Sequence, residues 1–126
     1  MAMEEVHIWL GDFPSDDALH DYLEEAYDED DDDAPINRFA AEQEVSFYDV
    51  DFLESGFDES GDLKSLIEGH SYSETYLDDL TAAAESEGIE HANTFIMVDA
   101  GEIEEPQSVS GDDYQLTYLG IFAAKS

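Results

Sequence analysis

The sequence predicts an α+β fold, in which a mostly antiparallel sheet of about four strands carries helices packed on one face. Two observations favour this class. Extended segments are indicated at the start, middle and end of the chain, with an apolar period of two in the first and the last, and segments with helical spacing lie between them. The strands do not alternate simply with single crossover helices, which argues against a doubly wound α/β fold. With 126 residues, the chain has the length of one domain, residues 1–126.

The first predicted strand covers residues 6–10. Aliphatic residues alternate there with two other side chains, in the order Val6, His7, Ile8, Trp9 and Leu10. A period of two gives a strand two dissimilar faces. We interpret the histidine as a partly buried structural residue and the tryptophan as a core residue.

A helix follows the turn at residues 11–14. Ser15 is a suitable N-cap, and the next two residues, Asp16 and Asp17, are acids, which the helix dipole favours in a first turn. Helical spacing then marks one buried stripe: Leu19, Tyr22, Leu23, Ala26 and Tyr27. The stripe ends in six adjacent acids, residues 28–33, which we expect to form a solvated loop.

The middle of the chain combines short helices with an extended segment. Pro35 restarts regular structure, and the apolar residues after it suit a short helix: Ile36, Phe39 and Ala40. Residues 45–57 contain many apolar side chains at spacings too irregular for a helix. We expect a strand around Phe52, with a turn before it.

Two more helices are predicted before the last strands. Asp62 starts a short helix that Gly69 ends, with an apolar face of Leu63, Leu66 and Ile67. Ser71 and Glu74 stand at capping-box spacing and open the longest helix, which Gly88 ends. Its inward-facing residues are Tyr76, Leu77, Leu80, Ala83 and Ala84.

Two strands close the chain, over residues 94–98 and 114–122. The loop between them, residues 99–111, contains Pro106 and is long enough to join antiparallel neighbours. The expected element order is therefore β-α-α-β-α-α-β-β.

Charge is the most informative property of the composition. The chain has 35 acidic residues against three lysines and arginines, which gives a formal net charge of −32. Such a protein repels nucleic acid and anionic membranes, and it attracts basic proteins at rates that salt reduces. Seven tyrosines, seven phenylalanines and one tryptophan nevertheless favour an ordered core over disorder.

Few features indicate a catalytic or metal site. The chain has no cysteine, so it has neither a disulfide nor a thiolate site. The acidic run fails as an EF-hand loop, because Asp33 stands where glycine is needed and Phe39 stands where glutamate is needed. Phosphate-loop and nucleophile-elbow motifs are absent, and the four histidines are scattered. We expect no cofactor, no metal and no enzymatic activity. The acidic N-terminus and the lack of a long apolar run predict a cytoplasmic protein.

Two acidic groups are the candidate partner-binding residues. The first is the run Asp28, Glu29, Asp30, Asp31, Asp32 and Asp33, whose charges lie closer together than the screening distance in physiological salt. The second interleaves acids with aromatic residues, as interface hot spots do, and consists of Tyr48, Asp49, Asp51 and Glu54. The alternative is that neither group binds a partner. The first would then be a solvated loop, and the second a sheet edge with solvated acidic side chains.

Several segments together resemble the immunity protein 22 family of bacterial polymorphic toxin systems. They are VHIWLGDF at 6–13, FAAEQ at 39–43, FYDVDFLE at 47–54, SYSE at 71–74, TFI at 94–96 and LTYLG at 116–120. The resemblance implies a small cytosolic α+β protein that binds and neutralises a toxin domain, often a nuclease, without catalysis. The chain departs from the family pattern in its scarcity of lysine.

Three interpretations of the acidity therefore stay open. The protein could inhibit a basic toxin through charge complementarity, with no direct contact to nucleic acid or membrane. It could mimic nucleic acid toward a DNA-binding or defence protein. It could instead be a domain adapted to a high-salt host, in which the charge has no role in binding.

Overall fold

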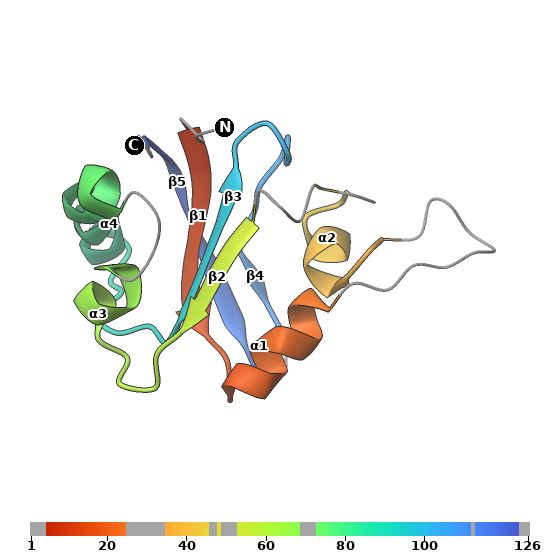
Figure 1. Ribbon diagram of the computed structural model, residues 1–126, viewed down its shortest axis with the longest axis horizontal. Helices are drawn as coiled ribbons and strands as arrows, with labels where there is room; N and C mark the ends of the chain where they lie inside the picture. Colours follow the sequence, from red (N-terminus) through yellow and green to blue (C-terminus); the bar gives the residue numbers. More distant parts are fainter. Residues whose placement is uncertain are drawn as a thin grey trace.

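The computed structural model describes residues 5–24, 35–45, 48, 53–68, 73–111 and 113–123 (Figure 1). Its elements are β1 (Glu5–Asp12), α1 (Asp16–Leu23), α2 (Arg38–Glu42), β2 (Leu53–Phe57), α3 (Leu63–Glu68), α4 (Ser73–Ser86), β3 (Thr94–Asp99), β4 (Val109–Ser110) and β5 (Gln115–Ala123). The predicted α+β class is confirmed. Some predicted features lie outside the described residues, namely Ala26 and Tyr27 of the first stripe, Phe52, Gly69 and Ser71.

The described strands form one five-stranded sheet in the order β2-β3-β1-β5-β4, and every neighbouring pair is antiparallel. The expectation of about four strands missed β4, a strand of two residues that lies within the predicted loop 99–111. It pairs with β5. The expectation that the last two predicted strands are neighbours is wrong, because β1 lies between β3 and β5. The N-terminal strand is thus the centre of the sheet.

Helices cover both faces of the sheet, which corrects the expectation of one covered face. In Figure 1, α3 and α4 lie on one side of the sheet, and α1 and α2 lie on the other. Ile8 of β1 packs with the α3 and α4 side, whereas Trp9 packs with the α1 and α2 side. In β3 the four consecutive residues 95–98 are all buried. Such a continuous apolar run is typical of a strand that is covered on both faces.

Local sequence signals set the predicted helix ends. Ser15 accepts a hydrogen bond from the Ala18 amide at 3.1 Å, as an N-cap does. Asp62 accepts one from the Ser65 amide and so caps α3. Gly88 follows α4 with a φ of +77°, a backbone conformation that glycine adopts without steric cost. These three predictions are confirmed, and the inward residues Tyr76, Leu80 and Ala84 of α4 are buried.

One close backbone approach determines how β1 meets β5. A Cβ atom on Gly11 would lie 1.8 Å from the backbone oxygen of Gln115, so only glycine fits there. Gly11 pairs with Leu116, at the end of the sheet where β1 leads into α1. The close contact therefore brings the start of β5 toward the start of α1, next to the candidate site.

Candidate partner-binding surface

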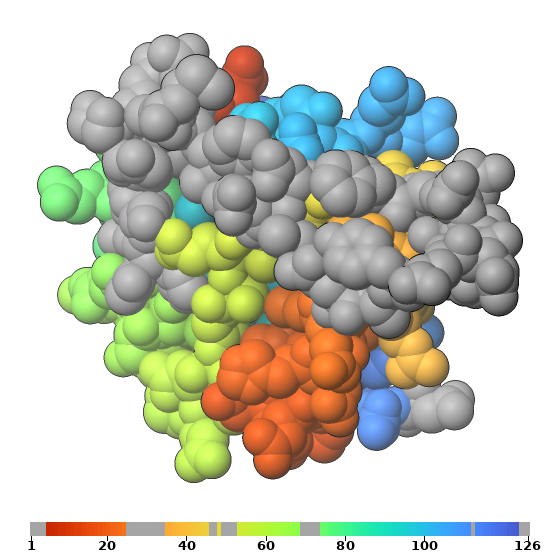
Figure 2. Space-filling view, turned by 45° about the vertical axis from the view of Figure 1, so that its right-hand side comes forward, coloured from red at the N-terminus to blue at the C-terminus, as the bar shows by residue number. Residues whose placement is uncertain are grey.

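Helix α1 presents acids outward and apolar residues inward. Leu19 and Tyr22 are buried, while the residues at the outer positions are exposed acids: Asp16, Asp17, Asp21 and Glu24. Figure 2 shows α1, in orange, on an outer face of the molecule beside the yellow-green chain around β2. This surface also includes Asp58, whose pKa is lowered because its carboxylate accepts a hydrogen bond from the Ser60 amide at 2.9 Å.

Asn37 joins the end of α1 to the start of α2. Its side-chain oxygen accepts a hydrogen bond from the Ala40 amide at 2.8 Å, which makes it the N-cap of α2. Its amide nitrogen donates to the Leu23 carbonyl at 3.1 Å and to the Tyr48 hydroxyl at 2.7 Å. Asn37 is itself buried. One side chain therefore fixes the position of both helices and of Tyr48.

A second polar junction holds α2 against the chain that leads into β4. The Gln107 carbonyl accepts hydrogen bonds from Trp9 Nε1 and from Gln43 Nε2, each at 2.9 Å. The Gln107 amide donates to Gln43 Oε1 at 2.7 Å, and its side chain donates to the Glu42 carbonyl. These bonds place Glu42 at the edge of a hollow between α1, α2 and the residues before β5.

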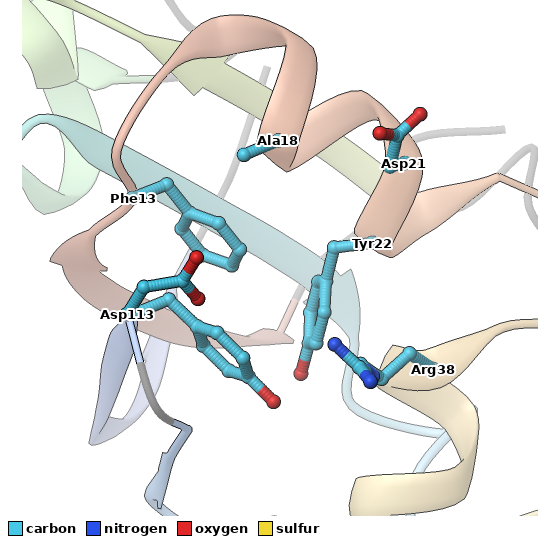
Figure 3. Close-up of a pocket in the computed structure, with 7 residues that line it drawn as sticks. Phe13, Ala18, Asp21, Tyr22, Arg38 and Asp113 are labelled. Carbon is cyan, nitrogen blue, oxygen red and sulfur yellow. The ribbon is translucent and has the colours of Figure 1, made fainter.

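The hollow has a volume of about 230 Å³ and an aromatic wall (Figure 3). The rings of Phe13 and Tyr114 stack at a centroid distance of 5.0 Å and an interplanar angle of 12°. The Tyr22 ring packs at 5.1 Å from each of them. Three charged residues complete its lining, Asp21 from α1, Arg38 from α2 and Asp113 from the chain before β5.

The tyrosines of the hollow are neutral at physiological pH. Burial, and then a hydrogen bond to the Glu42 carboxylate at 2.6 Å, raise the pKa of Tyr114 to about 12. Burial raises the pKa of Tyr22 well above its usual value, and the nearby Glu42 carboxylate raises it further. The Arg38 charge lowers both values, but its effect is smaller. Both hydroxyls therefore keep their protons at physiological pH, and that of Tyr114 is donated to Glu42.

The Tyr22 hydroxyl has no hydrogen-bond partner among the described residues. The Glu42 carboxylate is near enough to raise the pKa of Tyr22 both as a weak hydrogen-bond acceptor and through its charge, but it meets full hydrogen-bond geometry only with Tyr114. The side chain is only 3% exposed. Leaving a buried hydroxyl without a partner costs about 1–3 kcal/mol. The free protein therefore carries a polar group that is poorly satisfied.

Buried tyrosines should make the fold sensitive to alkali. Tyr22 and Tyr76 are buried, and their pKa values are raised chiefly by burial. The pKa of each tyrosine is higher in the folded protein than in the unfolded chain, where it is about 10. The free energy of unfolding is therefore at its full value below pH 10, and it falls as pH rises above 10 because the unfolded chain ionises first. Each tyrosine should cost about 1.4 kcal/mol of unfolding free energy by about pH 11.

Urea unfolding at constant salt, at pH 8 and at pH 11, measures this loss. We expect it to be about 3 kcal/mol from Tyr22 and Tyr76 together, with a further contribution from Tyr114, whose pKa of about 12 also exceeds the unfolded value. The variant Tyr22→Phe should lose about 1.4 kcal/mol less than the wild-type protein, since one of the contributing groups is then missing. Equal unfolding free energies at the two pH values would contradict the assignment of these tyrosines.

The residues predicted from sequence as partner-binding are not all brought together. Residues 28–33, Asp49 and Asp51 lie outside the described residues. Tyr48 is 2% exposed and belongs to the core on the α1 and α2 side of the sheet. Glu54 pairs in register with Met97, which faces the α3 and α4 side. Tyr48 and Glu54 therefore point toward opposite faces, and a buried Tyr48 is not offered to a partner.

Sequence reasoning missed the residues of the hollow. Tyr22 is predicted only as part of a buried stripe, and Tyr114 only as the start of a strand. Glu42, Arg38 and Asp113 carry no signal that relates them to either tyrosine. These side chains come together because α1, α2 and the chain before β5 meet at one place. No local sequence pattern predicts that meeting.

Three further observations concern chemistry. His7 is 4% exposed, and its ring nitrogens are hydrogen-bonded to the Tyr118 hydroxyl at 2.8 Å and to the Ile103 carbonyl at 2.9 Å, which confirms its structural position. Within the described ranges, no three histidine, aspartate or glutamate side chains form a group that could hold a metal ion. The helices described here are all too short or too polar to cross a membrane.

Comparison with known proteins identifies the family. The chain has no significant match among curated proteins, and none among solved structures. The family model described as immunity protein 22 matches residues 6–124 of the 126, from the first residues of β1 to the end of β5. The match covers the segments on which the sequence resemblance rests, together with the residues of the hollow. The chain therefore belongs to the immunity protein 22 family.

Proposed function

We propose that this protein binds and neutralises a cognate toxin with a basic surface, of the nuclease type, in the cytoplasm of the cell that makes it. Family membership supports a toxin as the partner. The net charge of −32 supports a basic one and is the observation that carries the proposal. The electrostatic field of such a surface attracts a positively charged protein and speeds its association, and complementary charges favour the complex that forms.

The physical argument for a nuclease concerns its substrate. An enzyme that cleaves nucleic acid binds phosphates with lysine and arginine side chains. Carboxylates fixed on a folded surface can meet the same cationic groups. Inhibition then follows from occupying or covering the cleft, and needs no catalytic group on the inhibitor.

The proposed docking groups are acids of two kinds, those predicted from the sequence and those exposed on α1. The acidic run 28–33 and the acids Asp49 and Asp51 remain part of the proposal from sequence. Glu54 also remains, although it shares the α3 and α4 side of the sheet with Met97 and does not face α1. The exposed acids of α1 add to them, since this helix ends at Leu23, a few residues before the run. Tyr48 is left out as a direct contact because its side chain is buried.

The test uses the polypeptide encoded immediately upstream as the candidate toxin, in stopped-flow mixing with this protein. The association rate constant should fall at least about tenfold between about 0.05 M and about 0.5 M salt. The dissociation rate constant should change much less, because salt screens the approach more than the formed contacts. A nuclease assay on the same mixture should show loss of cleavage at equimolar inhibitor.

Matched charge removals locate the docking face. The double variant Asp49→Asn with Asp51→Asn should weaken binding about tenfold. The double variant Asp78→Asn with Asp79→Asn removes the same charge from exposed positions of α4 and should weaken binding less than about twofold. Equal effects of the two pairs would contradict a localised acidic docking surface. Failure of the wild-type protein to bind any basic partner would overturn the proposed function.

A further inference from the structure

The hollow between α1, α2 and the chain before β5 has an unsatisfied group at its base. Figure 3 shows Tyr22 reaching down from α1 with its hydroxyl directed into the hollow, and with Arg38 and Asp113 on either side. The hydroxyl is buried and has no hydrogen-bond partner among the described residues. Such groups are rare in folded proteins unless something else supplies the bond.

The charge of the hollow favours a cation as the group that supplies the missing hydrogen bond. Asp21 and Asp113 line it, and the Glu42 carboxylate contacts Tyr114 at its edge, against the single positive charge of Arg38. Phe13 and Tyr114 form a stacked aromatic wall. Aromatic rings combined with carboxylates form the usual environment of a guanidinium or ammonium group.

We propose that this hollow receives a basic side chain of the bound toxin. The inference rests on the proposed function, which supplies a basic partner, and adds the place where one of its side chains is held. The incoming group donates a hydrogen bond to the Tyr22 hydroxyl, forms ion pairs with the surrounding carboxylates and packs against the ring of Tyr114. Binding then satisfies the hydroxyl that the free protein leaves without a partner.

Arg38 distinguishes a cationic occupant of the hollow from an anionic one. It is exposed and makes no ion pair within the described part of the chain. If the hollow takes a cation, Arg38 is a like charge beside it and weakens binding. If the hollow takes a carboxylate, Arg38 is the group that attracts it. Removing the Arg38 charge must therefore change the affinity in opposite directions for the two occupants.

The first experiment is Tyr22→Phe, with the same upstream polypeptide. The midpoint of thermal unfolding should stay the same or rise by about 2–5 °C, because a buried hydroxyl without a partner is removed and the ring is kept. Affinity for the toxin should fall about five- to tenfold through faster dissociation, with the association rate unchanged. Tyr76→Phe removes a buried hydroxyl from the opposite side of the sheet and should leave the affinity unchanged.

The second experiment is Arg38→Gln. Affinity should rise about two- to tenfold, whereas Asp113→Asn should lower it by a similar factor. Weaker binding by Arg38→Gln would overturn the proposal and indicate an anionic occupant. Unchanged affinity of Tyr22→Phe, with wild-type binding intact, would overturn it and leave the proposed function standing.

A probe that needs no toxin completes the test. Methylguanidinium chloride, titrated against sodium chloride at equal ionic strength, should shift the NMR signals of the Tyr22 and Tyr114 rings, with smaller shifts of Tyr114 in Tyr22→Phe. Sodium acetate should not produce these shifts. Equal shifts from acetate, or shifts that are the same in the variant, would overturn the cation site whether or not a toxin has been found.

Discussion

Replacing Trp9 with alanine should lower the free energy of unfolding by about 4 kcal/mol. The side chain is fully buried, and its ring lies edge-on at 5.1 Å from Phe39 and tilted at 5.2 Å from Tyr118. Its removal leaves a cavity between the central strand and α2, and it takes away one donor to the Gln107 carbonyl. Both losses act on the layer that supports the hollow.

Urea unfolding followed by circular dichroism measures this change, because the variant lacks the only tryptophan. Ile121→Ala is the matched control, since Ile121 is also an apolar residue of the sheet but is 54% exposed. That substitution should change stability by no more than about 0.5 kcal/mol. A loss below about 1 kcal/mol for Trp9→Ala would show that the α1 and α2 layer does not depend on this residue.

Stability should rise steeply with salt at low ionic strength. The 32 net charges are spread over an accessible surface of 7140 Å², which leaves about 220 Å² for each and a mean spacing of about 15 Å. The Debye length is about 30 Å at 0.01 M ionic strength and about 8 Å at 0.15 M, so the charges repel one another strongly only at low salt. The described ion pairs, His20 with Asp16 and Lys64 with Glu68, are both exposed and offset little of this repulsion.

Scanning calorimetry in sodium chloride from about 0.01 M to about 1 M tests this expectation. The midpoint should rise by about 10 °C or more, which corresponds to about 3 kcal/mol for a chain of this size. Most of the rise should come below about 0.2 M, where screening changes most. A variant with asparagine or glutamine at residues 28–33 should show a smaller rise. A midpoint that is flat across the whole range would contradict the role of repulsion.

Elements set by neighbouring residues could be predicted from the sequence. The alternation around Ile8 predicts β1, Ser15 predicts the start of α1, and Gly88 predicts the end of α4; the structure confirms all three. Each depends on the conformational preferences of a few adjacent residues. The charge predicts a basic protein as the partner, and that stays a prediction, because the family supports a toxin as the partner without indicating its charge.

Features set by distant residues could not be predicted in the same way. The place of β1 between β3 and β5 depends on pairing across most of the chain. The acids beside Tyr48 in the sequence predict a contact residue, yet its hydroxyl accepts a hydrogen bond from the Asn37 side chain in the core. The hollow needs Tyr22, Glu42 and Tyr114 from three separate segments, and its main clue, a hydroxyl without a partner, exists only in three dimensions.

The hydrogen bond from Asn37 to the Leu23 carbonyl has a consequence for how such a protein can diversify. It joins Leu23, at the end of α1, to Asn37, the N-cap of α2, so the two helices are held together by a contact that lies outside residues 25–34. The entropy of closing such an insertion grows slowly, by about 0.6 kcal/mol for each doubling of its length. We therefore expect that segments of other lengths and charges can replace residues 25–34 while the Asn37 bonds to Leu23 and Tyr48 are kept.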